Sequence, residues 1–463
     1  MDKIMYQIDF HKPETIHFIG IGGISMSGLA EILLDEGFTV SGSDSKRTEL
    51  TEHLEARGAK IFYGQRASNL YDGIDAVVYT AAIHPDNPEF MEAEARKIPM
   101  LSRAQLLGEM MRNYSQAVAI SGTHGKTTTT SMITEILLAA GEDPTISVGG
   151  ILNTIGGNIR VGGPELFVTE ACEYTNSFLS FFPTIEVILN IEEDHLDFFK
   201  DLSDIRNSFR EFAKKLPEDG LLVINSDIEN YHEIVDNLPC RVVTCGKKED
   251  SDYSASDITY DELACPSFDL LVKGQKKERI HLGVPGEHNV YNALAAIAVA
   301  DELRIPLDAI KSGLSDFAGT KRRFEKKGEI GGVVVIDDYA HHPHEISATL
   351  KTAANYPHRK LWCVFQPHTY TRTKAFLDEF AQALSAADEV ILADIYAARE
   401  TDNLGVSSED IAEKIRNLGT AAHYIPSFDE IETFILENCV NGDLLITMGA
   451  GDIVKVGEKL LGM

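Results

Sequence analysis

Residues 117–140 read AVAISGTHGKTTTTSMITEILLAA, and this stretch decides the fold of the chain. AVAIS is short and apolar enough for a buried strand, and SMITEILLAA has the apolar spacing of a helix. Gly122 and Gly125 let the connecting turn curl so that successive backbone N–H groups face a phosphate at the start of the helix. The stretch therefore predicts an α/β fold with an anion site at a strand-to-helix turn.

The turn itself, residues 122–130, offers the groups that hold a nucleotide triphosphate. Lys126 supplies a cation for phosphate and Thr127 a hydroxyl for magnesium. The strict phosphate-loop pattern is incomplete, because Ile120 stands where a first glycine is expected. A helix start capped by threonines is the alternative, but the strand before the turn and the helix after it favour phosphate binding. The predicted ATP contacts of this turn are Gly122, Thr123, His124, Gly125, Lys126, Thr127 and Thr128.

Strands and helices alternate on both sides of this stretch, which predicts three α/β domains in the 463 residues. The first, residues 1–105, begins with a β-α-β unit at Thr15. The second, residues 106–319, contains the phosphate turn and ends after a strongly helical segment and a shorter helix. The third, residues 320–463, follows a basic turn, GTKRRFEKKG, and alternates again.

Composition narrows the possible partners. A formal charge of −30 argues against nucleic acid or an anionic membrane as a partner, since both require clustered Lys and Arg. No apolar stretch reaches the length of a membrane helix, and the start of the chain lacks the apolar core of a signal peptide. Six scattered cysteines without a CxxC pair indicate reduced thiols. We expect a cytoplasmic protein.

Acidic groups follow two other strands of the second domain. Glu170 closes the strand in ELFVTE, and Asp194, His195 and Asp197 follow the strand in EVILNI. Solvated acids at strand ends are common, so neither cluster alone indicates a metal. Ligands bind at the carboxyl edge of parallel sheets, however, and we expect both clusters to share that edge with the phosphate turn.

A second glycine turn, GIGGISMSG, follows the first strand of the chain and allows a dinucleotide-binding interpretation. Gly20 and Gly22 fit the fingerprint and Asp44 lies at the expected distance for a ribose contact. Ser25 occupies the third fingerprint position in place of glycine or alanine, which weakens this interpretation.

Together, seven motifs in order resemble the Mur ligase family, over nearly the whole chain: GTHGKTTTT, EACEYTNSFL, NIEEDHLD, GEHNVYNALAA, RRFE, DDYAHHPHE and FQPHTYTRT. The similarity is greatest to the members that add L-alanine to UDP-N-acetylmuramate. It implies a Rossmann-like UDP-binding domain, a central P-loop ATPase-like domain and a Rossmann-like C-terminal domain. It also implies ATP and Mg²⁺, with phosphorylation of the sugar's lactyl carboxylate and attack of the amine on the acyl phosphate, in peptidoglycan precursor synthesis.

The resemblance assigns roles to individual residues. It places the UDP-sugar against Gly20, Gly22, Gly23, Ser25, Asp44, Asn153 and Thr154. It adds His288, Asn289, Asn292, Arg323 and Asp338 to the ATP contacts, and gives Thr127, Glu170 and His195 to the metal. The amino acid would face Tyr339, His341, His342 and Arg372. The catalytic set is Lys126, Glu170, His195, Arg323 and Asp338.

The segment HHPH has a competing interpretation as a metal site. Because His341 and His342 are adjacent and Pro343 interrupts regular structure, we favour substrate contact. KRRFEKK also has an alternative interpretation without a binding role, as a run of charged residues exposed to solvent.

Three alternative functions remain open at this point. One is the family member that attaches a preformed tripeptide instead of alanine. The second is a P-loop ATPase or switch without ligase chemistry, and the third is a nicotinamide oxidoreductase built on the first glycine turn. We expect a monomer or a weak homodimer.

Overall fold

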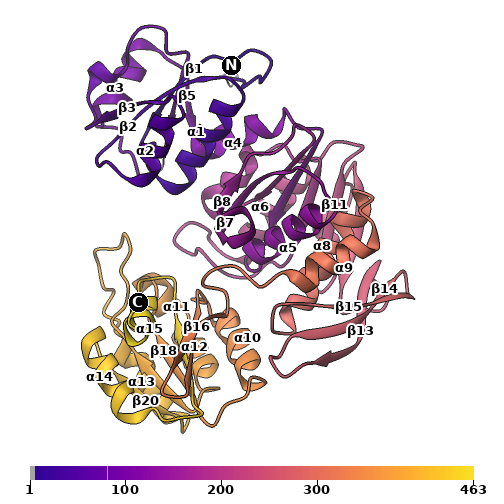
Figure 1. Cartoon of the computed structure of the whole chain (residues 1–463), viewed down its shortest axis with the longest axis vertical. Helices are drawn as coiled ribbons and strands as arrows, with labels where there is room; N and C mark the ends of the chain where they lie inside the picture. The colour runs from indigo at the N-terminus through magenta and orange to yellow at the C-terminus, as the bar shows by residue number, and fades with distance from the viewer. Residues whose placement is uncertain (1–5, 81) are drawn as a thin grey trace.

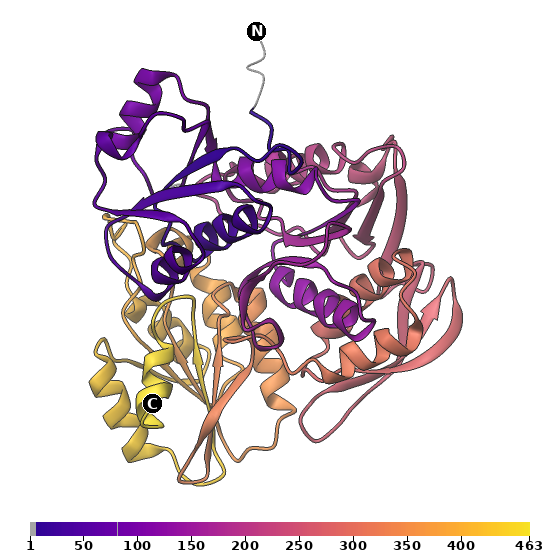
Figure 2. The ribbon, with the colours of Figure 1, turned by 45° about the horizontal axis from the view of Figure 1, so that its top comes forward.

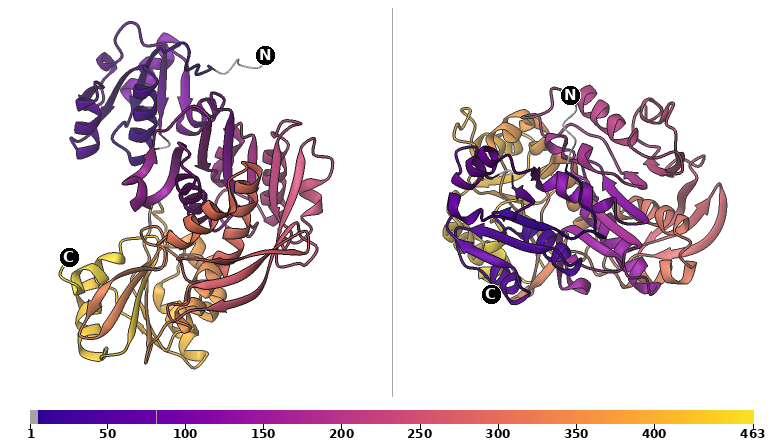
Figure 3. Two further views of the ribbon diagram at one scale, coloured as in Figure 1. Left: turned by 45° about the vertical axis from the view of Figure 1, so that its right-hand side comes forward. Right: turned by 90° about the horizontal axis from the view of Figure 1, so that it is seen from above.

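The computed structural model describes residues 6–80 and 82–463, and it contains three α/β domains that follow one another along the molecule (Figures 1 and 3). The N-terminal sheet is parallel, whereas the central and C-terminal sheets also contain antiparallel pairs. Each domain is built on its own sheet, of five, ten and six strands in chain order. The predicted α/β fold is therefore confirmed. No helix among the described residues has the length and apolar character needed to cross a bilayer.

The N-terminal sheet is entirely parallel, in the order β3-β2-β1-β4-β5. Its central strand β1 is buried and leads into the first glycine turn. The elements are β1 (Thr15–Ile19), α1 (Ile24–Asp35), β2 (Thr39–Asp44), α2 (Glu49–Ala56), β3 (Lys60–Tyr63), η1 (Ala67–Asn69), β4 (Ala76–Tyr79), α3 (Pro88–Arg96), β5 (Met100–Ser102) and α4 (Arg103–Met111).

The central sheet has the order β15-β14-β13-β12-β11-β10-β6-β9-β7-β8. Its first half comprises β6 (Gln116–Ser121), α5 (Lys126–Ala139), β7 (Thr145–Leu152), η2 (Asn153–Ile155), β8 (Gly157–Arg160), β9 (Leu166–Glu170), η3 (Tyr174–Ser180), β10 (Ile185–Ile188) and α6 (Leu202–Ala213). Its second half comprises β11 (Leu221–Asn225), α7 (His232–Val235), β12 (Arg241–Gly246), β13 (Tyr253–Tyr260), β14 (Pro266–Val272), β15 (Gln275–His281), α8 (His288–Glu302) and α9 (Leu307–Asp316).

Side-chain alternation along β6 shows why this sheet is covered on both faces. Val118 and Ile120 belong to one apolar cluster, with α5, α8 and α9, whereas Ala117 and Ala119 belong to another, with α6. A strand buried on both faces needs an uninterrupted apolar sequence, as AVAIS provides. In Figure 2, α5 lies beside the orange helices α8 and α9, which contact it.

The C-terminal sheet has the order β16-β17-β21-β18-β19-β20, with β16 antiparallel to the rest. Its elements are β16 (Glu325–Ile330), β17 (Val333–Asp338), α10 (Pro343–Ala354), β18 (Leu361–Phe365), α11 (Tyr370–Ala375), α12 (Leu377–Leu384), β19 (Glu389–Leu392), α13 (Ser408–Asn417), β20 (Ala421–Tyr424), α14 (Phe428–Asn438), β21 (Leu444–Met448) and α15 (Val454–Leu460).

Two local expectations are wrong here. The basic segment was expected to be a turn, but its second half forms β16, because the strand can pair with β17. Pro343 was expected to interrupt regular structure, yet it is the first residue of α10. Proline suits that position, since the first helical N–H has no partner within the helix.

The N-terminal and central domains pack closely through two glycines. A Cβ on Gly28 of α1 would lie 2.1 Å from Cγ1 of Ile159 on β8, and one on Gly108 of α4 would lie 1.9 Å from the Ser180 carbonyl oxygen. Side chains at these positions would force the domains apart. One apolar cluster also runs across both domains, so they share a core.

Candidate active site at the junction of the central and C-terminal domains

The phosphate turn, the two acidic segments and three neighbouring strands meet at one edge of the central sheet. Strands β10, β6 and β9 are adjacent and parallel, and each ends where its polar segment begins. Glu170 is the last residue of β9 and is paired with Ile120 of β6. The expectation of a shared carboxyl edge is confirmed.

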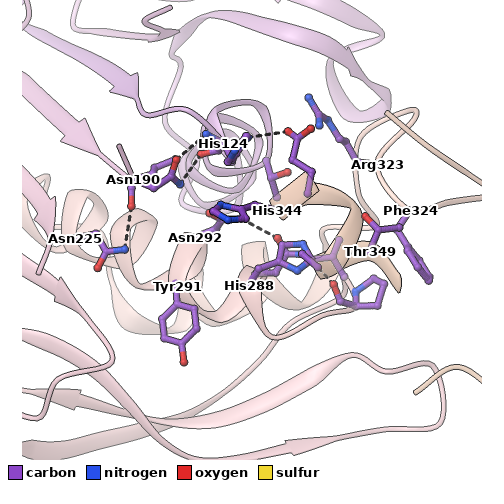
Figure 4. Close-up of a pocket in the computed structure, with 18 of the residues that line it drawn as sticks. His124, Asn190, Asn225, His288, Tyr291, Asn292, Arg323, Phe324, His344 and Thr349 are labelled. Atoms are coloured by element: carbon purple, nitrogen blue, oxygen red, sulfur yellow. Dashed lines mark hydrogen bonds and ion pairs between the residues drawn. The ribbon is translucent and has the colours of Figure 1, made fainter. Parts of the chain in front are cut away.

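Asn190, which follows β10, fixes the phosphate turn. Its amide oxygen accepts the His124 N–H at 2.7 Å, and its amide nitrogen donates to the His124 carbonyl at 3.0 Å (Figure 4). Thr123 N–H donates to the Asn190 carbonyl at 3.2 Å. Asn190 was not among the residues predicted from the sequence, although its position at a strand end was the available signal.

Gly125 cannot carry a side chain in this setting. Its φ of +84° lies in the left-handed region, and a Cβ would lie 2.6 Å from Oδ1 of Asn292 on α8. Asn292 is itself held by Asn289, whose Oδ1 accepts from Asn292 Nδ2 at 2.9 Å. Asn292, which was predicted for the nucleotide, therefore packs against the turn, and Asn289, predicted likewise, holds Asn292 in place.

Lys126, the first residue of α5, is held by a neighbouring carboxylate. Its ammonium donates to Oε2 of Glu173 at 3.0 Å and to the carbonyls of Gly122 and Thr123. Burial lowers the pKa of Lys126, but the charge of Glu173 outweighs burial and raises it above its ordinary value. Lys126 is therefore a fixed cation at the mouth of the turn.

The three residues predicted for a metal lie around the same sheet edge. Thr127 is buried at the start of α5, and Glu170 accepts the backbone N–H of Gly149 with Oε1. His195 has a φ of +53° and stacks on Tyr174 with ring centroids 4.5 Å apart. The hydroxyl of Tyr174 donates to Asp197 at 2.7 Å. This bond fixes the tyrosine ring on which His195 stacks.

A cavity of about 340 Å³ separates the central domain from the C-terminal domain beside the turn (Figure 4). It is lined by eight of the residues predicted for ATP: His124, Gly125, Thr128, His288, Asn289, Asn292, Arg323 and Asp338. Several further lining residues were not predicted from the sequence, among them Asn225, Asp227, Lys247, Tyr291, Phe324, His344 and Glu345. They come from β11, α8, α10 and three loops, which only the tertiary structure brings together at this cavity.

Arg323 and Asp338 reach the cavity from the C-terminal domain. Asp338 accepts N–H groups of Phe324 at 2.8 Å and Ala340 at 2.7 Å, which fixes the backbone beside Arg323. Burial raises the pKa of Asp338 to about 6, against the opposing effect of Arg323. The guanidinium of Arg323 lies 5.2 Å from the centre of the Tyr339 ring.

Residues predicted for the amino acid gather next to the His195 segment. The guanidinium of Arg372 is bound to Asp194, and Nε2 of His342 lies 3.0 Å from the carbonyl of Glu193. Burial lowers the pKa of His341 and of His342 to about 4, so both imidazoles are neutral. Tyr339 packs edge-on against His341, with ring centroids 5.6 Å apart.

Residues predicted for the UDP-sugar occupy two places. Gly20, Gly22 and Gly23 form the turn before α1, and Ser25 is the second residue of α1. Asp44 at the end of β2 accepts the Gly22 N–H at 2.8 Å. A Cβ on Gly22 would lie 2.8 Å from the same carboxylate. Asn153 and Thr154 lie apart from that turn, in η2 of the central domain.

Comparisons with known proteins agree with this architecture. The family model described as "Mur ligase family, catalytic domain" matches residues 15–115, "Mur ligase middle domain" matches 120–300, and "Mur ligase, glutamate ligase domain" matches 322–451. A UDP-N-acetylmuramate--L-alanine ligase from Lachnospira eligens is 63% identical over 458 residues, which cover 99% of this chain and 100% of the relative.

Two solved structures extend the comparison. The UDP-N-acetylmuramate-alanine ligase of Thermotoga maritima has a TM-score of 0.79 at 31% identity, covering 97% of this chain and 98% of the other. A murein peptide ligase from Psychrobacter arcticus has a TM-score of 0.68 at 26% identity, with the same coverage of 97% and 98%.

Proposed function

The chain belongs to the Mur ligase family, and from this membership we propose that it is an ATP-dependent ligase that joins L-alanine to the lactyl carboxylate of UDP-N-acetylmuramate, in peptidoglycan synthesis. One observation in the structure carries the proposal. The phosphate turn of the central domain lines a cavity whose other wall brings Arg323 and Asp338 from the C-terminal domain. An oxidoreductase built on the first glycine turn would not need that second wall.

Similarity favours alanine over a tripeptide as the acceptor. The relative at 63% identity is an alanine ligase, whereas the murein peptide ligase structure is 26% identical to this chain. The alanine ligase structure from Thermotoga maritima also has the higher TM-score of the two solved relatives.

The phosphoryl transfer depends mainly on alignment and on neutralising charge. Lys126, fixed at the start of α5, would hold the β- and γ-phosphates, and the N–H groups of the turn would surround them. Arg323 would reach the phosphates from the opposite domain. His288, Asn289 and Asn292 line the same cavity and would contact the adenine end. The products of the first step are ADP and an acyl phosphate on the sugar substrate.

The residues predicted for magnesium fit a divalent cation. Glu170 uses Oε1 on the Gly149 N–H, and its second oxygen and the Thr127 hydroxyl supply the oxygen donors that magnesium prefers, with the His195 imidazole beside them. Magnesium, when bound, would neutralise charge between the ATP phosphates and the substrate carboxylate. Lys126 and Arg323 then need to supply only the remaining positive charge.

The acceptor side would use Arg372 for the alanine carboxylate, since a guanidinium binds carboxylates with two parallel donors. The neutral imidazole of His341 can accept a hydrogen bond from the amine. The amine attacks the acyl phosphate, and the tetrahedral intermediate collapses to the amide and phosphate. Tyr339 and His342 would complete this subsite.

The first glycine turn would hold the uridine diphosphate, because its N–H groups precede the helix α1. Asp44 keeps the turn in shape through Gly22. Asn153 and Thr154 would contact the sugar from the central domain. We further propose that the protein is cytoplasmic and acts as a monomer or weak homodimer.

The proposal is tested by supplying UDP-N-acetylmuramate, ATP and MgCl₂ with L-alanine, and with each other amino acid or the tripeptide L-alanyl-γ-D-glutamyl-diaminopimelate. We expect phosphate release and a product of the mass of the alanine amide with L-alanine. Faster turnover with the tripeptide would favour the murein peptide ligase, and phosphate release without any acceptor would favour an ATPase. Omitting MgCl₂ should abolish turnover.

A further inference from the structure

Four side chains with metal-binding atoms meet between the phosphate turn and α10, outside the predicted magnesium residues. His124 belongs to the turn and Glu192 to the segment after β10, while His342 and His344 lie at the start of α10. One nitrogen of His124, one carboxylate oxygen of Glu192 and one nitrogen of His342 lie within 4.8 Å of one another. Among the described residues, this is the only group of three or more such side chains so placed.

The distances centre on one oxygen atom. Oε2 of Glu192 lies 3.1 Å from Nε2 of His124 and also contacts Nδ1 of His344. The His124 and His342 rings are 4.8 Å apart, and those of His342 and His344 are 5.4 Å apart. Three imidazoles from two domains therefore surround one carboxylate.

The Nε2 atom of His124 has an unusual environment. It is buried, and among the described residues it has no hydrogen-bond partner of acceptable geometry, although Glu192 is at ion-pair distance. The opposite ring nitrogen, Nδ1, lies 3.1 Å from Oε1 of Glu345. A metal-bound histidine commonly has this arrangement, in which one nitrogen faces the ion and a carboxylate orients the other.

We propose that His124, Glu192, His342 and His344 form a transition-metal site that joins the phosphate turn to the C-terminal domain. Zinc bonds nitrogen and oxygen at about 2.0–2.2 Å, so its tetrahedral ligand atoms lie about 3.3 Å apart. The ligand atoms of His124, Glu192 and His342 lie within 4.8 Å of one another, and Glu192 already contacts both His124 and His344. Metal binding would open these two contacts to that spacing and would replace the hydrogen bond between His342 and the Glu193 carbonyl. Three imidazoles and one carboxylate select Zn²⁺, Ni²⁺ or Cu²⁺ over Mg²⁺, which prefers oxygen ligands.

Binding at this site has two consequences. Burial lowers the pKa of His124, but Glu345 and Glu192 outweigh it and raise the pKa to about 10, so the metal must displace one proton from His124. His342, which faces it, is already neutral. The ion also ties the two domains together beside the cavity, so we expect Zn²⁺ to slow nucleotide exchange.

The test uses the full chain stripped of metal, without magnesium or nucleotide. Co²⁺ is titrated first, because its visible absorption distinguishes four-coordinate from six-coordinate binding, and Zn²⁺ is then added to displace it. We expect the four-coordinate spectrum in the unmodified chain. Glu192→Gln and His344→Gln, which alter different domains, should each weaken Zn²⁺ binding at least about tenfold.

Two controls separate this site from others. His281→Gln removes an exposed histidine on β15, and Glu170→Gln removes a predicted magnesium ligand; neither should change the Co²⁺ spectrum. An unchanged spectrum in both Glu192→Gln and His344→Gln, or its loss in Glu170→Gln, would overturn the proposal. X-ray absorption of the Zn²⁺-loaded unmodified chain gives an answer even if a variant fails to fold: fewer than two imidazole ligands would also overturn it.

Discussion

The guanidinium of Arg372 donates two hydrogen bonds to one carboxylate oxygen of Asp194, from Nη2 at 2.9 Å and from Nε at 3.2 Å. The pair connects α11 of the C-terminal domain to the segment after β10, and both side chains are at most 10% exposed. Burial raises the pKa of Asp194, but Arg372 outweighs burial and holds it well below the usual range. Asp194 therefore fixes the residue predicted to bind the alanine carboxylate, directly beside His195.

Arg372→Ala should raise the KM for L-alanine far more than the KM for ATP, because the substrate carboxylate loses its guanidinium. Loss of one partner from a buried charge pair costs about 2–5 kcal/mol, so we expect at least about a 30-fold rise. Steady-state kinetics with each substrate varied in turn would measure both constants. Equal changes in the two KM values would contradict the assigned role.

Asp194→Asn should produce a smaller effect of the same kind. The amide keeps the shape of Asp194 but removes its charge, so Arg372 is held less firmly while remaining available to the substrate. We expect the KM for L-alanine to rise and the KM for ATP to change little. A variant in which only the ATP constant changed would place Arg372 with the nucleotide instead.

Lys126→Ala should reduce kcat at least about 100-fold, because removing one fixed donor to a developing charge has this effect in other enzymes. The lysine is the part-buried cation of the phosphate turn and is already positioned by Glu173. Lys277→Ala, which removes an exposed lysine on β15, is the matched control and should retain full turnover. Full turnover in Lys126→Ala would exclude the turn from catalysis.

Gly125→Ala should abolish nucleotide binding, since the added Cβ meets Asn292 at 2.6 Å in a left-handed backbone conformation. Gly141→Ala provides the control, because Gly141 has a similar φ of +80° with no atom within 4 Å of its Cβ position. The control separates backbone strain, about 1–2 kcal/mol, from the clash with Asn292. We expect calorimetric titration with ATP to show normal affinity for Gly141→Ala alone. Similar affinities in both variants would show that the contact is unimportant.

Glu186→Met should stabilise the protein. Glu186 on β10 is fully buried, and neither carboxylate oxygen has a hydrogen-bond partner among the described residues. Removing these unsatisfied atoms should raise the free energy of unfolding of the central domain by about 1–3 kcal/mol. Thermal unfolding at pH 7.5 would measure this gain, with the exposed Glu218→Met as control.

The gain from Glu186→Met should also depend on pH, because burial raises the pKa of Glu186 well above its ordinary 4.5. Below the unfolded-state pKa, the carboxyl is protonated in both the native and the unfolded state, so its ionisation does not change the free energy of unfolding. As pH rises above about 4.5, the unfolded chain ionises first and the native protein loses stability relative to it. The difference between variant and unmodified chain should therefore grow from pH 4 to pH 7, and a constant difference would contradict this account.

The sequence predicted the three α/β domains because strand and helix periodicities are local properties of the chain. It also predicted that the phosphate turn, Glu170 and His195 lie at one sheet edge, since parallel strands place their carboxyl ends together. It did not predict β16, whose charged sequence forms a strand only because β17 is available for pairing. Nor did it identify Asn190, because the amide contacts a turn 66 residues away in the chain.

Residues 117–140 by themselves determined a strand, a glycine turn and a helix that can hold a phosphate. Which side chains surround that phosphate depends on contacts between distant segments. Glu173 binds Lys126, Asn292 packs against Gly125, and Glu345 contacts His124. The last contact joins residues 221 positions apart and crosses from one domain to another. Local sequence sets backbone periodicity, whereas the partners of each polar group are fixed only when the domains pack together.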